Sequence, residues 1–147
     1  MIRNTAVTVC GPLNVNKLGV TYVHEHLMVK PQLPDEYYIP YTLDDEAAST
    51  EETRSFSAAG GETLVEMTPI NYGRNVKAYQ RIAQATGVHV ICCTGFHKQL
   101  FMPPWFGDKT DGELYDILMN EVTNGLDDTE IHPGVIKLGT SFEEVTA

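Results

Sequence analysis

The sequence is poor in cysteine. Its 147 residues include three, Cys10, Cys92 and Cys93. An odd number of cysteines, two of them adjacent, does not form a disulfide framework. Neighbouring residues on a strand point to opposite faces, so Cys92 and Cys93 are not placed to bind one ion together. We therefore expect three reduced thiols that pack as small apolar side chains.

The chain also lacks a long apolar run and an excess of basic residues. No stretch approaches the ~20 apolar residues of a membrane-spanning helix, and the first residues do not have the apolar core of a signal peptide. Ten Lys and Arg stand against 20 Asp and Glu, a net charge of −10. Such a chain gains nothing from counterion release on nucleic acid or on an anionic membrane. We expect a cytoplasmic protein with neither nucleic acid nor membrane as a partner.

Two nucleotide-binding motifs are missing as well. No Gly-x-Gly-x-x-Gly follows the first expected strand, and no Walker loop occurs anywhere in the chain. Their absence disfavours a dinucleotide-binding or P-loop fold. The 42% of hydrophobic and 20% of charged residues are ordinary for one globular domain with a buried core.

What the sequence does contain is a regular alternation of apolar strands and helices. Residues 1–18 are expected to form a short hairpin, with a strand at 6–10 and a turn at 11–14, or an irregular lead-in. Strands are expected at 19–26, 63–68, 88–94 and 134–139. Helices are expected between them at 42–59, 74–86 and 111–126, the first with Thr42 or Asp44 as its N-cap. Continuous apolar strands alternating with helices predict a parallel sheet covered by helices. Two loops rich in proline and aromatic residues, 30–40 and 96–107, interrupt this pattern as packing loops or lids.

Two histidines stand at the end of the first strand. Positions two apart on a strand face the same way, so His24 and His26 present two imidazoles to one point. This is what a metal ion needs from its first two ligands. Hydrogen-bonded core histidines remain the alternative, because the pattern is short. Glu25, between them, is expected to face the helix layer.

Four stretches in order extend this pattern over nearly the whole chain. They are Leu-Gly-Val-Thr-Tyr-Val-His-Glu-His-Leu (18–27), Gly-Gly-Glu-Thr-Leu-Val-Glu-Met-Thr (60–68), Ala-Gln-Ala-Thr-Gly-Val (83–88) with Cys-Thr-Gly-Phe (93–96), and Gly-Val-Ile-Lys-Leu-Gly-Thr-Ser (134–141). Together they resemble the phosphotriesterase family of the amidohydrolase superfamily. The resemblance implies a parallel (β/α) barrel, the TIM barrel of metal-dependent hydrolases. Such barrels take about 250 residues, so residues 1–147 resemble the N-terminal half, with about four βα units.

The resemblance also implies a site. The family holds two divalent metal ions, usually zinc, bridged by a hydroxide and a carboxylated lysine. His24 and His26 match two ligands of one metal, and Lys137 matches the bridging lysine, which makes it a catalytic residue too. An ammonium group has no lone pair for a cation, whereas the carbamate of a neutral lysine is carboxylate-like. Lys137 extending to solvent or pairing with Glu66 is the alternative.

Other family positions are weaker or have no counterpart. Phe96 and His97, in the loop after the third strand, are candidate substrate contacts, and Trp105 lies in the same loop. His89 and His132 are expected to have structural roles or to lie at the surface. The family's two histidines from strands five and six, and its aspartate from strand eight, match nothing in this chain.

The expected function is a zinc-dependent hydrolase acting on a small-molecule ester, lactone or phosphotriester, of which this chain carries the first half. One alternative is a catalytically incomplete fragment or assembly subunit that needs a C-terminal half-barrel or forms a homo-oligomer. Another is a different amidohydrolase, such as a cyclic amidase. The contexts of Gly95 and Lys137 fit the phosphotriesterase branch better.

Overall fold

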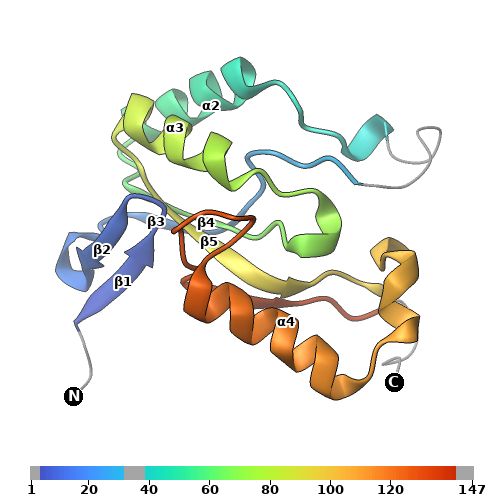
Figure 1. The fold of residues 1–147 in the computed structure, drawn as a ribbon. Helices are drawn as coiled ribbons and strands as arrows, with labels where there is room; N and C mark the ends of the chain where they lie inside the picture. The colour runs from blue at the N-terminus through green and yellow to red at the C-terminus, as the bar shows by residue number, and fades with distance from the viewer. Residues whose placement is uncertain (1–3, 32–38, 142–147) are drawn as a thin grey trace.

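A four-stranded parallel sheet organises the molecule (Figure 1). The computed structural model describes residues 4–31 and 39–141. The strands β3 (Thr21–Glu25), β4 (Thr63–Glu66), β5 (His89–Phe96) and β6 (Val135–Leu138) pair in chain order, each parallel to the next. The predicted parallel sheet is thus confirmed. Much of the proline-rich loop expected at 30–40 lies outside the described residues.

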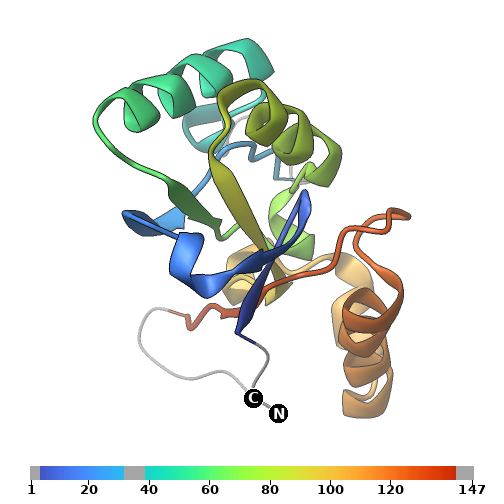
Figure 2. The same ribbon diagram turned by 90° about the vertical axis from the view of Figure 1, so that its left-hand side faces the viewer.

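Within the described ranges, three helices connect the strands (Figures 1 and 2). They are α2 (Glu46–Ala58), α3 (Val76–Thr86) and α4 (Asp111–Asn124). Each begins at a polar N-cap that accepts a backbone N–H, namely Asp45, Asn75 and Thr110. The prediction of Thr42 or Asp44 as the first cap was wrong, because the chain stays extended to Asp45. Helices α2 and α3 lie side by side, while α4 lies apart from them against β5.

Short 3₁₀ turns fill several connections. They are η1 (Val15–Lys17), η2 (Ile39–Tyr41), η3 (Ile70–Tyr72), η4 (Gln99–Phe101) and η5 (Pro104–Asp108). The last two give the loop expected at 96–107 a definite conformation. No helix in the described ranges is long and apolar enough to cross a bilayer.

An antiparallel hairpin precedes the sheet. It pairs β1 (Thr5–Thr8) with β2 (Gly11–Asn14), as expected, but the turn is at Val9 and Cys10 instead of 11–14. Gly11 and Pro12 belong to a strand because this hairpin is an edge, where proline is tolerated. The Val9 N–H donates to the Val90 carbonyl at 2.9 Å. This bond ties the hairpin to the beginning of β5.

The main core lies between the sheet and α3. Tyr79 and Ile82 of α3 are at most 1% exposed and belong to one apolar cluster with Leu64 and Val90 of the strands. Helix α4 is covered far less: Val122, on its expected apolar stripe, is 44% exposed. The three cysteines are free, as predicted, and Cys92 and Cys93 are buried. The expected packing of Cys10 was wrong, because it lies exposed in the hairpin turn. Burial raises the pKa of Cys92 to about 12.

Candidate metal centre

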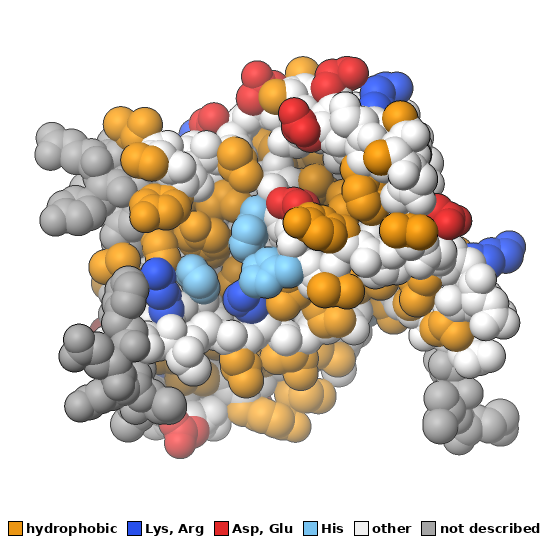
Figure 3. All heavy atoms as spheres, turned by 180° about the vertical axis from the view of Figure 1, so that it is seen from behind, with side chains coloured by type: hydrophobic (Ala, Val, Ile, Leu, Met, Phe, Trp, Pro, Cys, Tyr) orange, Lys and Arg blue, Asp and Glu red, His pale blue; other side chains and the backbone are white. Residues whose placement is uncertain are grey.

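The carboxyl ends of the two outer strands bring the predicted site residues together. The Lys137 Nζ of β6 lies 3.5 Å from the His24 Nε2 of β3. The rings of His24 and His26 meet edge to face, with centroids 5.3 Å apart. Figure 3 shows His and Lys side chains gathered at the centre of this face, with hydrophobic side chains around them. Residues 113 positions apart in sequence therefore share one site.

An irregularity in β3 sets which side chains reach this face. Tyr22 pairs with Leu64 and Glu25 with Glu66, so β3 advances three residues while β4 advances two. The extra residue is a β-bulge, which breaks simple alternation. Tyr22 therefore packs against Phe56 of α2, with ring centroids 6.3 Å apart. In a strand without the bulge, its spacing of two residues from His24 would place it on the same face as the histidines.

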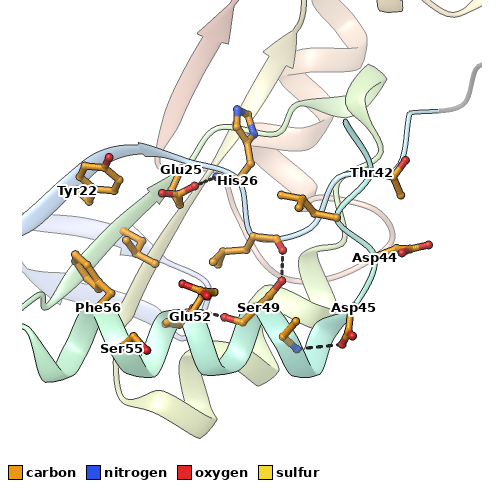
Figure 4. Close-up of a pocket in the computed structure, with 15 residues that line it drawn as sticks. Tyr22, Glu25, His26, Thr42, Asp44, Asp45, Ser49, Glu52, Ser55 and Phe56 are labelled. Carbon is orange, nitrogen blue, oxygen red and sulfur yellow. Dashed lines mark hydrogen bonds between the residues drawn. The ribbon is translucent and has the colours of Figure 1, made fainter. Parts of the chain in front are cut away.

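A cavity of about 580 Å³ lies on the other side of β3, against α2 (Figure 4). Tyr22, Glu25 and Phe56 are among its lining residues, and the ring of His26 points away from it. The Glu25 carboxylate accepts the His26 backbone N–H at 2.9 Å. Glu25 thus faces the helix layer, as predicted. His26 also lines this cavity, but its ring points away from it.

His26 is held by one definite hydrogen bond. Its Nδ1 lies 2.8 Å from the Thr68 hydroxyl, and its ring stands edge-on to Tyr72 at 5.7 Å. Burial, with smaller contributions from His24, Lys137 and His97, lowers the pKa of His26 to about 4. The imidazole is therefore neutral at pH 7, the form that binds metals.

Glu66 lies behind that hydrogen bond and has no exposed surface. Its Oε1 accepts from the Thr68 hydroxyl at 2.5 Å and from the Leu27 N–H at 3.2 Å, and its Oε2 accepts the Thr68 N–H at 3.0 Å. Burial raises the pKa of Glu66 to about 8, against these hydrogen bonds, which lower it. Within the described residues Glu66 forms no ion pair with Lys137, so the alternative pairing of these two is wrong.

Gly95 explains how Lys137 reaches its position. It pairs with Lys137 across β5 and β6 and has a φ of +113°. A Cβ on Gly95 would lie 2.0 Å from the Lys137 carbonyl oxygen. Glycine alone permits this approach, which explains why the Thr-Gly-Phe stretch has a glycine at this position.

The other candidates occupy an aromatic cluster beside the site. The His97 ring stacks on Phe101 at 4.9 Å and lies 4.7 Å from Tyr72, and its buried Nδ1 has no hydrogen-bond partner among the described residues. Burial, followed by Lys137 and Lys98, lowers the pKa of His97 to about 4. Phe96 is 8% exposed and packs on Trp105 and Phe106.

The two remaining histidines lie elsewhere. His89 begins β5, at the opposite end of the strand from the site. The His132 Nδ1 lies 3.1 Å from the Val122 carbonyl, beside α4. Both positions agree with the expected structural roles.

The donor set fits one part of a two-metal centre. His26 uses Nδ1 for Thr68, which leaves Nε2 for a cation, and His24 offers its Nε2 beside Lys137. Two imidazoles suit zinc. In the described part of the chain no group of three or more His, Cys, Asp or Glu side chains could hold a metal ion. The described residues therefore supply fewer ligands than two ions require.

Comparisons with known proteins agree with this geometry. The model of the phosphotriesterase family matches residues 4–147. The chain belongs to the phosphotriesterase family. Its relatives include a phospho-furanose lactonase from Mycoplasmopsis synoviae, 32% identical over 97% of this chain and 45% of the relative.

Solved structures in the phosphotriesterase family show the same fold. A lactonase from Listeria monocytogenes superposes with a TM-score of 0.86 at 28% identity, covering 97% of this chain and 49% of that one. An organophosphorus hydrolase from Deinococcus radiodurans superposes with a TM-score of 0.83 at 32% identity, covering 97% of this chain and 46% of that one. The chain thus spans about half the length of these proteins. Its sheet is the N-terminal half of a phosphotriesterase-like TIM barrel, as predicted.

Proposed function

We propose that this chain supplies the first half of the active site of a zinc-dependent hydrolase of esters. The observation that carries the proposal is the convergence of His24, His26 and Lys137 at the carboxyl ends of β3 and β6. Active sites of (β/α) barrels lie at this end of the strands. The substrate class is a small lactone, phosphotriester or related ester, supported by the lactonase and hydrolase names of the similar proteins.

Each residue has a separate part in this proposal. His24 and His26 would each donate an imidazole nitrogen to one metal ion. Lys137 would bridge two ions as a carbamate, formed when its neutral amine bonds to the carbon of carbon dioxide and releases a proton. Bound zinc ions supply Lewis acidity and lower the pKa of water. Phe96 and His97 would border the substrate, on the side of the aromatic cluster.

The test is a fusion of this chain to the C-terminal half of the Listeria lactonase. We expect the fusion to bind two zinc ions and to hydrolyse a lactone or an aryl phosphotriester. A fusion carrying His24→Ala and His26→Ala should lose at least one metal ion and most of the activity. His89→Ala is the matched control, because this histidine lies at the far end of its strand. A folded fusion without metal and without hydrolysis would refute the proposal.

A second candidate is an assembly subunit that works only with a partner. The outer strands carry exposed apolar side chains: Val20 before β3 and Val23 in it are 63% and 71% exposed, and Ile136 and Leu138 of β6 are 66% and 78% exposed. Exposed strand edges pair readily with other chains. Such a partner would be a C-terminal half-barrel or, in a homo-oligomer, a second copy.

A further inference from the structure

We propose that Thr68 and Glu66 are positioning residues that hold His26 in the tautomer with the proton on Nδ1, so that Nε2 is free to bind a metal. The three side chains form a line from the buried interior to the candidate site: Glu66 Oε1, Thr68 Oγ1 and His26 Nδ1. The metal part of this inference rests on the proposed function. The tautomer part concerns the chain itself.

The number of protons shared by Glu66, Thr68 and His26 decides which group donates in each of the two hydrogen bonds. Thr68 has one hydroxyl proton, which it can give either to Glu66 or to His26. The 2.5 Å separation of Thr68 Oγ1 from Glu66 Oε1 is typical of a hydroxyl donating to a carboxylate. The hydroxyl oxygen then meets the Nδ1 at 2.8 Å as an acceptor. When Glu66 is ionised, His26 must therefore carry its proton on Nδ1.

The surroundings of Glu66 support the same direction. Both of its oxygens already accept backbone N–H groups, from Leu27 and Thr68. Because burial raises the pKa of Glu66 to about 8, the carboxylate is ionised above that pH, and it then has no proton to give to Thr68. Glu66 and Thr68 are both completely buried, so no solvent competes for the hydroxyl. The line thus has one acceptor at its inner end and one metal-binding nitrogen at its outer end.

This arrangement gives the metal ligand an indirect link to a carboxylate. Histidine ligands usually donate their second N–H to a carboxylate, a carbonyl or water. Here the hydroxyl of Thr68 stands between the imidazole and the acid. Without that acceptor, neutral imidazole can place its proton on Nε2, where it blocks coordination.

Nuclear magnetic resonance of the metal-free chain tests the tautomer. Long-range ¹H–¹⁵N correlations identify which ring nitrogen of His26 bears the proton, and pH 9 keeps Glu66 ionised. We expect Nδ1–H in the parent and in Thr68→Ser, which retains a hydroxyl. In Thr68→Val the population should shift to Nε2–H, and Glu66→Gln should shift it in the same direction because its amide can donate to Thr68.

The matched control is Thr53→Val. Thr53 is 2% exposed, and its hydroxyl donates to the Ser49 carbonyl within α2. This variant loses a buried hydroxyl away from the site, so the His26 tautomer should not change. An Nε2–H tautomer in the parent, or an unchanged tautomer in Thr68→Val, would overturn the positioning role.

Zinc titration adds a readout that separates the two proposals. Thr68→Val should weaken zinc binding about tenfold, as loss of the group behind a ligand typically does, while Thr68→Ser should restore it. If the fusion with the C-terminal half of the Listeria lactonase binds no zinc in any variant but the tautomers behave as expected, the proposed function fails and the positioning role stands. If zinc binds equally to all variants, the link between tautomer and metal is refuted.

Discussion

Three histidines lie close together in the candidate site, yet the surroundings of each imidazole ring are different. His24 is exposed and contacts Lys137, His26 is fixed by Thr68, and His97 is stacked between aromatic rings. A neutral imidazole with a free nitrogen can bind a metal, while a stacked ring chiefly contributes packing. The same residue type therefore has distinct chemistry within a few ångströms.

A first prediction follows from the lowered pKa of His97. In the unfolded chain this imidazole takes up a proton near its ordinary pKa of 6.5, and in the folded protein only near 4. The stability associated with the neutral ring is thus complete above pH 6.5 and decreases as the pH falls towards 4. His97→Phe keeps a stacked ring and removes the titration. At pH 5 we expect this variant to gain about 1 kcal/mol relative to the parent, allowing for solvent screening.

The measurement is urea denaturation of parent and variant at pH 7.5 and at pH 5. Parent and variant must be compared with each other, because the titration of Glu66 changes the stability of both with pH in the opposite direction to that of His97. Its pKa is raised to about 8, so its contribution is complete below about 4.5 and is lost as the pH rises through 8. An equal change of the two midpoints between these pH values would contradict the prediction.

The sequence predicted the positions of site residues that belong to a local pattern. It did not predict those whose place in the site depends on contacts between distant segments. His24, His26 and Lys137 follow from strand position and family resemblance, and they do converge. Thr68 was missed as the partner of His26, because their contact spans 42 positions and crosses between strands. Glu66 was missed with it, because it reaches His26 only through Thr68. The available signal was a carboxylate two residues before a threonine in an otherwise apolar strand.

At the scale of elements, the order of strands and helices was predictable and their exact geometry was not. Apolar runs identified all four parallel strands. The bulge in β3 was missed, because nothing local to Tyr22 or Glu25 marks the extra residue. The strand β5 also continues to Phe96 through Gly95, which the sequence placed at its end. Register depends on neighbouring strands, and no single-segment pattern contains it.

Helix α4 is held by a buried ionic cluster more than by its apolar stripe. The Arg74 side chain is 2% exposed and pairs with Glu121 of α4, which is 7% exposed. Arg74 also binds Asp127 after the helix, with Nε 2.9 Å from Oδ2. Thr94 of β5 donates to the Glu121 Oε2 at 2.5 Å. The cluster thus joins α4 to the sheet and to the segment before α3.

Arg74→Met tests that role. The variant leaves the Glu121 carboxylate buried without its cation, so we expect a loss of about 3–5 kcal/mol in the free energy of unfolding. Arg81→Met is the matched control, because Arg81 is 55% exposed and solvent screens its ion pair with Glu46, so its loss should cost far less stability than the loss of Arg74. Urea denaturation of both variants gives the comparison. Similar losses in the two would show that the buried cluster adds nothing beyond a surface pair.

For the whole molecule, the decisive feature is a sheet whose two outer strands have no further pairing partner among the residues that the structure describes. Related proteins are about twice as long, and this chain matches one half of them. Family resemblance made the half-barrel predictable from sequence. What covers its outer strands was not predictable, because pairing partners for β3 and β6 do not occur in the described residues.

The exposed apolar residues of these strands lead to a last prediction. Val23 of β3 and Ile136 of β6 are 71% and 66% exposed, and strand edges of this kind pair with other chains unless charge prevents it. We expect the isolated chain to associate as its concentration rises, and the double variant Val23→Lys and Ile136→Lys to remain monomeric. Val122→Lys is the control, since this 44% exposed residue lies on α4, away from both edges. Sedimentation velocity over a range of concentrations measures the difference. A parent that stays monomeric throughout would mean that the twist and the residual charge of the edges already prevent pairing, and it would count against both the homo-oligomer and an obligate partner.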